Sequence, residues 1–257
     1  GAIAEDGTNV SGALIVTDID ASESAFQAET VSGNYGSVTI DAAGAWTYTI
    51  DNTLAAIQSL GAGESASDTV TVRTADGTTE AITITISGTN DVPTVSGVVT
   101  GSSTDAGSIF TIDLLAGATD ADASDTLITT GVTLVSGDAT GATVNADNTI
   151  SVDPSVYKHL GVGQDLDITY AYDVVDTNGA SVSQTAVITV TGTNDVPVIT
   201  GDVVGAIAED GTSVSGALIV TDIDTNGPAF QAETVSGNYG SVTIDAAGAW
   251  TYTVDNT

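Results

Sequence analysis

Pairs of acidic residues separated by one position are the residues in this sequence best suited to do chemistry. An Asp-x-Asp triplet recurs every 102 residues, at Asp18/Asp20, Asp120/Asp122 and Asp222/Asp224. In an extended strand, residues i and i+2 point to the same side, so each triplet presents its two carboxylates together. Two such charges about 5 Å apart repel by roughly 3 kcal/mol at an effective dielectric constant near 20. A bound cation would turn this repulsion into attraction.

An acidic hinge also recurs in the chain. "SGTNDVPTVSG" at Ser87–Gly97 returns as "TGTNDVPVITG" at Thr191–Gly201. In both copies the proline restricts the preceding valine to an extended conformation, which stiffens the hinge. Asn and Asp are good turn residues in their own right, so an ordinary acidic turn is the competing interpretation.

The strongly negative net charge of the chain limits which kinds of molecule could bind it. The 257 residues include 34 Asp and Glu but only two basic side chains, Arg73 and Lys158, and the formal net charge is -32. Nucleic acids and anionic membrane surfaces would repel such a chain, whereas cations would bind it. Scattered acidity could instead serve solubility alone. The chain has no Cys, no signal-peptide pattern at its start and no apolar run of the roughly 20 residues that a membrane helix needs.

The chain contains a long internal repeat. Gly205–Thr257 repeats Gly1–Thr53 with only a few changes, and the hinge and the Asp-x-Asp triplets recur at about half that distance. We therefore expect two related modules, A and B, followed by part of a second A. The predicted boundaries are 1–92, 93–196 and 197–257, with the first strand of module A truncated and the third module incomplete. A longer parent chain of alternating A and B modules would follow from this order.

Alternating apolar and hydroxyl residues predict strands throughout. "AITITISG", "DITYAYDV" and "AVITVTG" are examples, and turn sequences such as "ADGT" and "DTNG" separate them. Module A should have one strand before Glu5 and then strands at 10–17, 25–31, 37–41, 46–50, 68–74 and 80–87. We expect an all-β fold of tandem seven-stranded, Ig-like or cadherin-like β-sandwich modules in a linear array.

The order of the strands predicts where the acidic residues gather. If successive strands reverse direction, loops after odd-numbered strands lie at one end of a module and loops after even-numbered strands at the other. Two acidic junctions result. The first should collect Glu5, Glu64, Asn90, Asp91, Asp120, Asp122 and Asp176. The second should collect Asp105, Asp165, Asn194, Asp195, Asp222 and Asp224.

This set of ligands favours calcium. Ca²⁺ takes six to eight oxygen ligands from carboxylates, amides and backbone carbonyls, whereas thiolate- or imidazole-seeking metals would find almost no suitable residues here. "DIDTNGPAFQAE" at Asp222–Glu233 also satisfies the pattern of an EF-hand loop. Strands rather than helices flank it, so we interpret the match as incidental, and we expect Glu233 to be exposed on a strand.

The modules resemble two known kinds of repeat. "EDGTNVSGALIVTDID", "GNYGSVTIDAAGAWTYTIDN" and "SGTNDVP" resemble the VCBS repeat of giant bacterial surface proteins, and "ATDADASD" with "LGVGQDLDITYAYDVVDTNG" resembles the bacterial cadherin-like repeat. Together the resemblances cover nearly the whole chain. They imply an extender region of an RTX-type adhesin, exported by type I secretion to the cell surface and acting in cell adhesion and biofilm formation. The cadherin-like calcium pattern matches the first junction in order, while Asp105 and Asp165 stand where it expects Glu.

Other functions have less support. His159 is the only histidine, no nucleophile elbow or phosphate loop occurs, and each close acid pair recurs at a module boundary, so we expect no enzyme. Tyr157 and His159 should be packing or surface residues of a short turn. Trp46 and Trp250 alternate with Tyr48 and Tyr252 in "AWTYT", and we expect one face of these strands to be core and the other exposed. The exposed aromatics could stack on sugars, so a module that binds glycans or another cell's surface is a second alternative. A subunit of a self-assembling extracellular filament, in contact with other copies of itself, is the third alternative.

Overall fold

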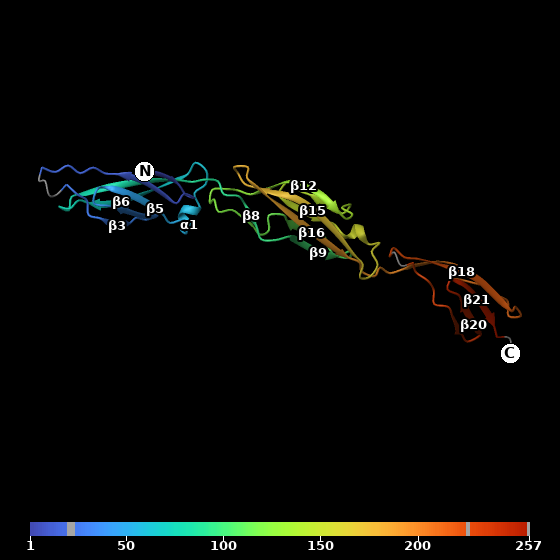
Figure 1. Ribbon diagram of the computed structural model, residues 1–257. Coiled ribbons are helices and arrows are strands. Elements are labelled where there is room, and N and C mark those ends of the chain that lie inside the picture. Colours follow the sequence, from blue (N-terminus) through green and yellow to red (C-terminus); the bar gives the residue numbers. More distant parts are fainter. Residues whose placement is uncertain (20–23, 225–226, 256–257) are drawn as a thin grey trace. The chain divides into compact units, whose positions relative to one another are not determined.

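The computed structural model describes residues 1–19, 24–224 and 227–255, and its regular elements are β-strands apart from two short helical turns (Figure 1). The chain divides into two compact units. Unit 1 comprises Gly1–Val98, Leu115–Thr133 and Ala171–Thr185, and unit 2 comprises Val99–Leu114, Leu134–Tyr170 and Ala186–Thr257. Within the described ranges, no helix is long and apolar enough to cross a membrane.

The first module forms two sheets from seven strands. One sheet has the order β1 (Ala2–Ala4), β7 (Thr79–Ser87), β6 (Ser65–Arg73), and the other has the order β2 (Asn9–Ala13), β5 (Ala45–Ile50), β4 (Gly36–Ile40), β3 (Glu29–Ser32). The neighbours are antiparallel except for β1, which runs parallel to β7. The sequence therefore predicted all seven strands of this module, although β2 and β3 are shorter than expected.

Alternation of residue types creates the core of this module. In β7 the isoleucines Ile82, Ile84 and Ile86 are buried, and the threonines between them are exposed. Trp46 and Tyr48 project from the same face of β5 and are also buried, with 8% and 0% of their surface exposed. Apolar side chains of both sheets thus pack together as a β-sandwich. Because these two aromatic rings lie in the core, they offer no surface on which a sugar could stack.

A buried carboxylate links the two sheets. Asp68 of β6 has no exposed surface and accepts hydrogen bonds from the backbone N–H groups of Asn34 and Tyr35, each at 2.9 Å, and from the Tyr48 hydroxyl at 2.8 Å. Burial raises the pKa of Asp68, but these hydrogen bonds outweigh it and hold that pKa below its ordinary value. The alternating pattern alone did not identify this polar member of the core.

The glycine of the repeated hinge has a packing role. A Cβ atom at Gly88 would lie 2.3 Å from the carbonyl oxygens of Leu60 and Gly61, which is closer than real contacts allow. Gly88 donates its N–H to the Glu64 carbonyl over 2.9 Å and so fixes the end of β7 against the loop that follows α1 (Ala55–Gln58). Gly192 has the same close approach to the carbonyl oxygens of Leu160 and Gly161. The recurrence of glycine in the hinge therefore follows from close backbone packing.

The second module has the same general construction. One sheet has the order β12 (Ile128–Ser136), β15 (Asp165–Val175), β16 (Ser181–Thr191), β9 (Val99–Thr104), and another has the order β10 (Phe110–Asp113), β14 (Thr149–Val152), β13 (Ala142–Val144). A short pair joins β8 (Thr94–Val95) to β11 (Ala118–Thr119). The 3-10 helix η1 (Pro154–Tyr157) corresponds to α1 of the first module. Tyr157 is buried, and its hydroxyl donates to the Asp138 carbonyl, which agrees with the predicted packing role.

The third module forms one five-stranded sheet. Its order is β17 (Val198–Gly201), β18 (Ser213–Thr221), β21 (Ala249–Val254), β20 (Gly240–Ile244), β19 (Glu233–Ser236), and Figure 1 shows β18, β21 and β20 side by side. In the first module the corresponding sheet packs against β6 and β7. Here the same face lines an open hollow of about 600 Å³ that includes Val242, Ile244 and Trp250.

Candidate metal centre

Glu5 is held rigidly at the end of the first module. Because β1 and β7 run parallel, both end at the same edge, and the Glu5 side chain meets the start of the hinge. Its Oε1 atom accepts hydrogen bonds from the Thr89 backbone N–H at 2.8 Å and from the Thr89 hydroxyl at 3.0 Å. Glu5 has no exposed surface, and its Oε2 atom has no hydrogen-bond partner among the described residues.

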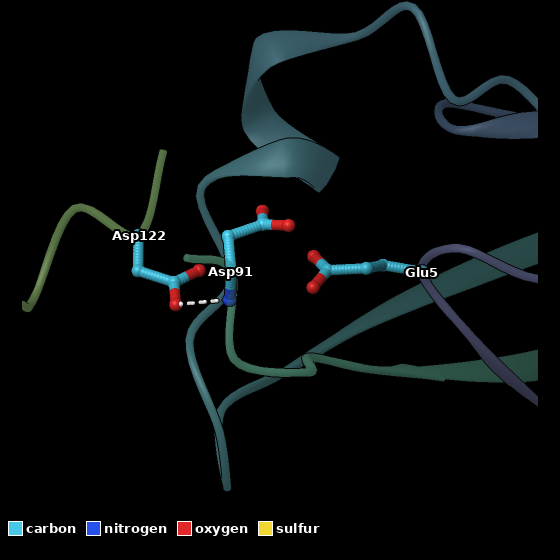
Figure 2. A group of neighbouring side chains, drawn as sticks. All are labelled: Glu5, Asp91 and Asp122. Atoms are coloured by element: carbon cyan, nitrogen blue, oxygen red, sulfur yellow. Dashed lines mark hydrogen bonds between the residues drawn. The ribbon is translucent and has the colours of Figure 1, made fainter. Parts of the chain in front are cut away.

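Asp91 and Asp122 complete a group of three carboxylates with Glu5 (Figure 2). The backbone N–H of Asp91, in the hinge, donates to Oδ2 of Asp122 over 2.9 Å. One carboxylate oxygen from each of the three residues lies within 4.8 Å of those of the other two. Asp122 is only 2% exposed, and within the described part of the chain its Oδ1 atom has no hydrogen-bond partner. In Figure 2 the carboxylates of Glu5 and Asp91 face each other, and the Asp122 carboxylate lies beside the Asp91 backbone, from whose N–H it accepts a hydrogen bond.

A second group of carboxylates adjoins the first through the Asp-x-Asp triplet. Asp120, Asp125 and Asp176 also bring one oxygen each within 4.8 Å of the others. Asp120 accepts the Asp122 backbone N–H at Oδ1 over 3.0 Å, and its Oδ2 atom is buried with no partner that the described residues provide. Asp176 receives the Asn90 side-chain amide at Oδ2 over 2.8 Å. We call these six acids together with Asn90 the first acidic cluster.

The protonation behaviour of the first acidic cluster reflects crowding of negative charge. Burial raises the pKa of Asp91, and the charges of Asp122, Asp6 and Asp120 raise it further. Burial is also the main cause that raises the pKa values of Glu5 and Asp122, and neighbouring carboxylates add to it. The hydrogen bonds that these two side chains accept lower their pKa values by less. For Asp176 burial acts in the same direction, but the Asn90 amide and three backbone N–H groups outweigh it, so its pKa is lowered. Without a cation, the clustered charges therefore destabilise one another.

The unpartnered oxygens of the first acidic cluster suit a hard cation. Four buried acceptors have no hydrogen-bond donor in the described ranges: Glu5 Oε2, Asn90 Oδ1, Asp120 Oδ2 and Asp122 Oδ1. A buried polar atom left without a partner costs about 1–3 kcal/mol, so several in one place call for a ligand. All four are oxygen atoms, and Ca²⁺ is bound through oxygen atoms in this way.

The remaining residues predicted for the first junction are placed as follows. Glu64 is exposed, and its Oε2 atom accepts the Gly61 N–H of its own loop at 3.1 Å, while its backbone carbonyl holds Gly88. Sequence reasoning overlooked Asp125 and Asp6. Asp125 is the third acid of "DADASD" and Asp6 directly follows Glu5, so both lay next to residues already singled out. Asp6 accepts the Thr89 hydroxyl at 3.2 Å.

A second acidic cluster repeats much of this frame. We define it as Asp105, Asn194, Asp195, Asp222 and Asp224. Asp105 Oδ1 accepts the Thr193 backbone N–H at 3.0 Å, as Glu5 does from Thr89. The Asp195 N–H donates to Asp224 Oδ2 over 3.1 Å, and the Asp224 N–H donates to Asp222 Oδ1 over 3.0 Å. The same hinge thus builds the same backbone contacts twice.

The second acidic cluster also contains buried oxygen atoms without a hydrogen-bond partner among the described residues. Asp105 is 1% exposed and Asp224 is 9% exposed. The described residues supply no hydrogen-bond partner to Asp105 Oδ2, Asp195 Oδ2 or Asp224 Oδ1.

The surroundings of the second acidic cluster differ from those of the first at several positions, beginning with Asp105 and Ala106 in place of Glu5 and Asp6. Lys158 places its Nζ atom 2.9 Å from Asp195 Oδ1, whereas the first module has Gln58 at this point of the repeat. Gln164 accepts the Gly161 N–H with its side chain, as Glu64 accepts the Gly61 N–H in the first module, so an uncharged amide stands where the first module has a carboxylate. Gly227 stands where Asp125 stands in the earlier copy.

The expected position of Asp165 is corrected by the structure. The Glu64 counterpart is Gln164, and Asp165 is instead the exposed first residue of β15, where its Oδ1 atom accepts the Thr191 hydroxyl at 2.6 Å. The sequence comparison was displaced by one residue. A shift of one position along a strand moves a side chain to the opposite face.

Asp222 and Glu233, the first and last residues of the loop that fits the EF-hand pattern, have different surroundings. Glu233 is the first residue of β19 and is exposed, as expected for a residue on a strand. Asp222 and Asp224 belong to the second acidic cluster through the hydrogen bonds given above. Residues 225 and 226 of this loop, like Asp20 of the first triplet, lie outside the described ranges.

Comparison with known proteins gives three domain matches along the chain. Residues 1–88 match the model of a bacterial cadherin-like domain, residues 89–191 that of a cadherin-like domain, and residues 194–257 that of a bacterial Ig domain. No curated protein matches the chain. The fold is thus that of tandem cadherin-like and Ig-like β-sandwich modules. Domains of these classes are typically structural or adhesive and extracellular, and cadherin-like domains usually bind calcium.

A solved cadherin structure agrees with this fold, and two protocadherin structures also match the chain with lower scores. Human CDH23 EC21-23 has a TM-score of 0.54 at 12% identity, with 100% of this chain and 87% of that chain covered. Protocadherin Gamma B7 extracellular cadherin domains 1-4 has a TM-score of 0.46 at 15% identity, with 99% of this chain and 65% of that chain covered. The Protocadherin GammaB4 extracellular domain has a TM-score of 0.49 at 15% identity, with 99% of this chain and 42% of that chain covered. The chain therefore spans less than two thirds of each of these two protocadherin structures.

Proposed function

We propose that this chain is a calcium-stiffened extender segment of a large bacterial cell-surface adhesin. The observation that carries the proposal is the set of buried oxygens without partners in the first acidic cluster, contributed by Glu5 and the hinge on one side and by the Asp-x-Asp triplet on the other. With calcium bound, ligands from both sides of the hinge would be held together. The hinge would then resist bending.

Two groups of residues would hold calcium at the first acidic cluster. Glu5, Asp91 and Asp122 form one, and Asp120, Asp125 and Asp176 form the other, with the Asn90 amide oxygen available beside them. Calcium supplies positive charge and a flexible coordination shell that accepts carboxylate and amide oxygens. The protein supplies fixed acceptors, because hydrogen bonds to Glu5, Asp120, Asp122 and Asp176 orient each carboxylate beforehand.

The proposed wider role rests on the modular order and on the resemblance to VCBS and cadherin-like repeats. Modules at 1–92, 93–196 and 197–257 belong to a longer array of the VCBS and cadherin-like kind, exported by type I secretion as part of an RTX-type adhesin. In this role the segment spaces a distal adhesive domain from the cell surface during adhesion and biofilm formation. Its partners are neighbouring modules of the same chain, and its net charge of -32 disfavours contact with nucleic acid or insertion into membranes.

Calcium removal tests this function. Thermal unfolding and small-angle scattering of the whole chain should be measured in calcium, in EDTA and in magnesium at equal ionic strength. Each site bound only in the folded state adds about 2.7 kcal/mol when free calcium is a hundredfold above its dissociation constant, so the melting temperature should rise and the scattering should indicate a stiffer chain. Equal melting and equal dimensions in calcium and EDTA would refute the proposal. An equal response to magnesium would indicate charge screening instead of a calcium site.

A further inference from the structure

We propose that Lys158 is a built-in cation of the second acidic cluster, which competes there with calcium and makes this cluster fill only at higher calcium concentration than the first. This inference rests on the proposed function, because it assumes that the first acidic cluster binds calcium. It concerns the regulation of stiffness along the chain. The first hinge would stiffen at low calcium concentration, and the second would stiffen only when calcium displaces or outcompetes the ammonium group.

The position of Lys158 is the first support. Its Nζ atom lies 2.9 Å from Asp195 Oδ1, and the side chains are 39% and 24% exposed. Through this contact the ammonium group brings a positive charge to Asp195, the counterpart of Asp91 in the first acidic cluster.

The two acidic clusters can be compared residue by residue because they share the same backbone hydrogen bonds. In both clusters the acid after the first strand, Glu5 or Asp105, accepts a hydrogen bond from the backbone N–H of the hinge threonine. The hinge aspartate, Asp91 or Asp195, donates its backbone N–H to the last acid of the Asp-x-Asp triplet. In both clusters buried oxygens remain open among the residues described, including Oδ2 of Asp105, whose side chain is almost fully buried. The second acidic cluster thus keeps acceptors for a cation. What changes is the charge around them.

The negative charge is reduced at four corresponding positions, one of which has Ala106 in place of Asp6. Lys158 replaces Gln58, Gln164 replaces Glu64 and Gly227 replaces Asp125. In the first acidic cluster, Glu5, Asp91 and Asp122 bring one oxygen each within 4.8 Å of the others, whereas their described counterparts Asp105, Asp195 and Asp224 form no such group. Fewer negative charges and one added positive charge weaken the attraction for a divalent ion. The same lysine stabilises the second acidic cluster when calcium is absent.

The test compares Lys158→Gln with the unchanged protein. Gln restores the residue found at this point in the first module. Calcium binding should be followed by titration calorimetry, and local protection by hydrogen exchange in peptides around Asp91 and around Asp195. The unchanged protein should show two steps, with protection around Asp91 appearing first. Lys158→Gln should move the second step to at least about tenfold lower calcium concentration and should reduce protection around Asp195 in EDTA.

Three further variants isolate the cause. Lys158→Arg keeps the positive charge and should retain the late second step. Arg73→Gln removes the only other basic side chain, which lies exposed on β6, and should leave both steps unchanged. Gln164→Glu adds a carboxylate and should also move the second step to lower concentration.

The outcomes separate the two proposals. Absence of any calcium-dependent protection around Asp91 would overturn the proposed function. Normal protection around Asp91, with a second step that Lys158→Gln does not move, would overturn only the role of Lys158. Simultaneous filling of both clusters in the unchanged protein would also contradict it.

Discussion

The backbone N–H of Asp91 donates to the Asp122 carboxylate over 2.9 Å, and this bond ties the hinge to the Asp-x-Asp triplet of the following module. It occupies Oδ2 and leaves Oδ1, the other oxygen of the same carboxylate, buried without a partner among the described residues. Asp122 therefore has two separable roles. One oxygen positions the hinge, and the other is available to a cation.

Asp122→Asn separates these roles. An amide oxygen can still accept the Asp91 N–H, but the negative charge is lost, so calcium affinity at the first acidic cluster should fall about tenfold or more. Stability in EDTA should stay the same or increase, because one repelling charge is gone. Calcium titrations followed by thermal unfolding measure both effects. Glu80→Gln, at an exposed site on β7, is the matched control and should change neither. An unaltered calcium response in Asp122→Asn would exclude Asp122 as a ligand.

The dependence of stability on pH should have an unusual sign in calcium-free protein. The pKa values of Glu5, Asp91 and Asp122 are raised by burial and by neighbouring charges. Between the ordinary value near 4 and the raised value, the folded state binds more protons than the unfolded state, so the free energy of unfolding falls as pH rises through this window. Acidification from neutral pH into this window should therefore stabilise the calcium-free chain.

Calcium should reverse this sign. Protons compete with the ion for the same carboxylates, so acidification over the same window should weaken the calcium-dependent stabilisation. Denaturant unfolding at a series of pH values, in EDTA and in calcium, measures both slopes. Parallel slopes under the two conditions would contradict a shared set of carboxylates.

The buried pair Tyr48 and Asp68 provides a prediction about the fold itself. Tyr48→Phe removes the 2.8 Å hydrogen bond to a fully buried carboxylate, which should cost about 1–3 kcal/mol of unfolding free energy. It should also let the pKa of Asp68 rise. Since stability contributed by a lowered pKa is lost as pH falls through the folded value, acid unfolding of the variant should begin at higher pH.

Tyr252→Phe is the internal control for this prediction. Tyr252 occupies the same point of the repeat as Tyr48 and is only half-buried, and the described residues place no carboxylate in hydrogen-bond contact with its hydroxyl. Denaturant unfolding should therefore show little change for Tyr252→Phe. Equal losses in the two variants would mean that ring packing, rather than the bond to Asp68, carries the effect.

Alternation of residue types and the repeated hinge were enough to predict the β-sandwich modules, the strands of the first module and the gathering of Glu5, Asp91 and Asp122. Period-two patterns determine which face of a strand is buried, and parallel strands such as β1 and β7 end at one edge. Only the tertiary structure decided which oxygens are left without partners, that Asp125 joins the first acidic cluster, that Gln164 rather than Asp165 corresponds to Glu64, and that Lys158 reaches Asp195. These relationships depend on ångström-scale distances between loops remote in sequence, which strand patterns do not encode.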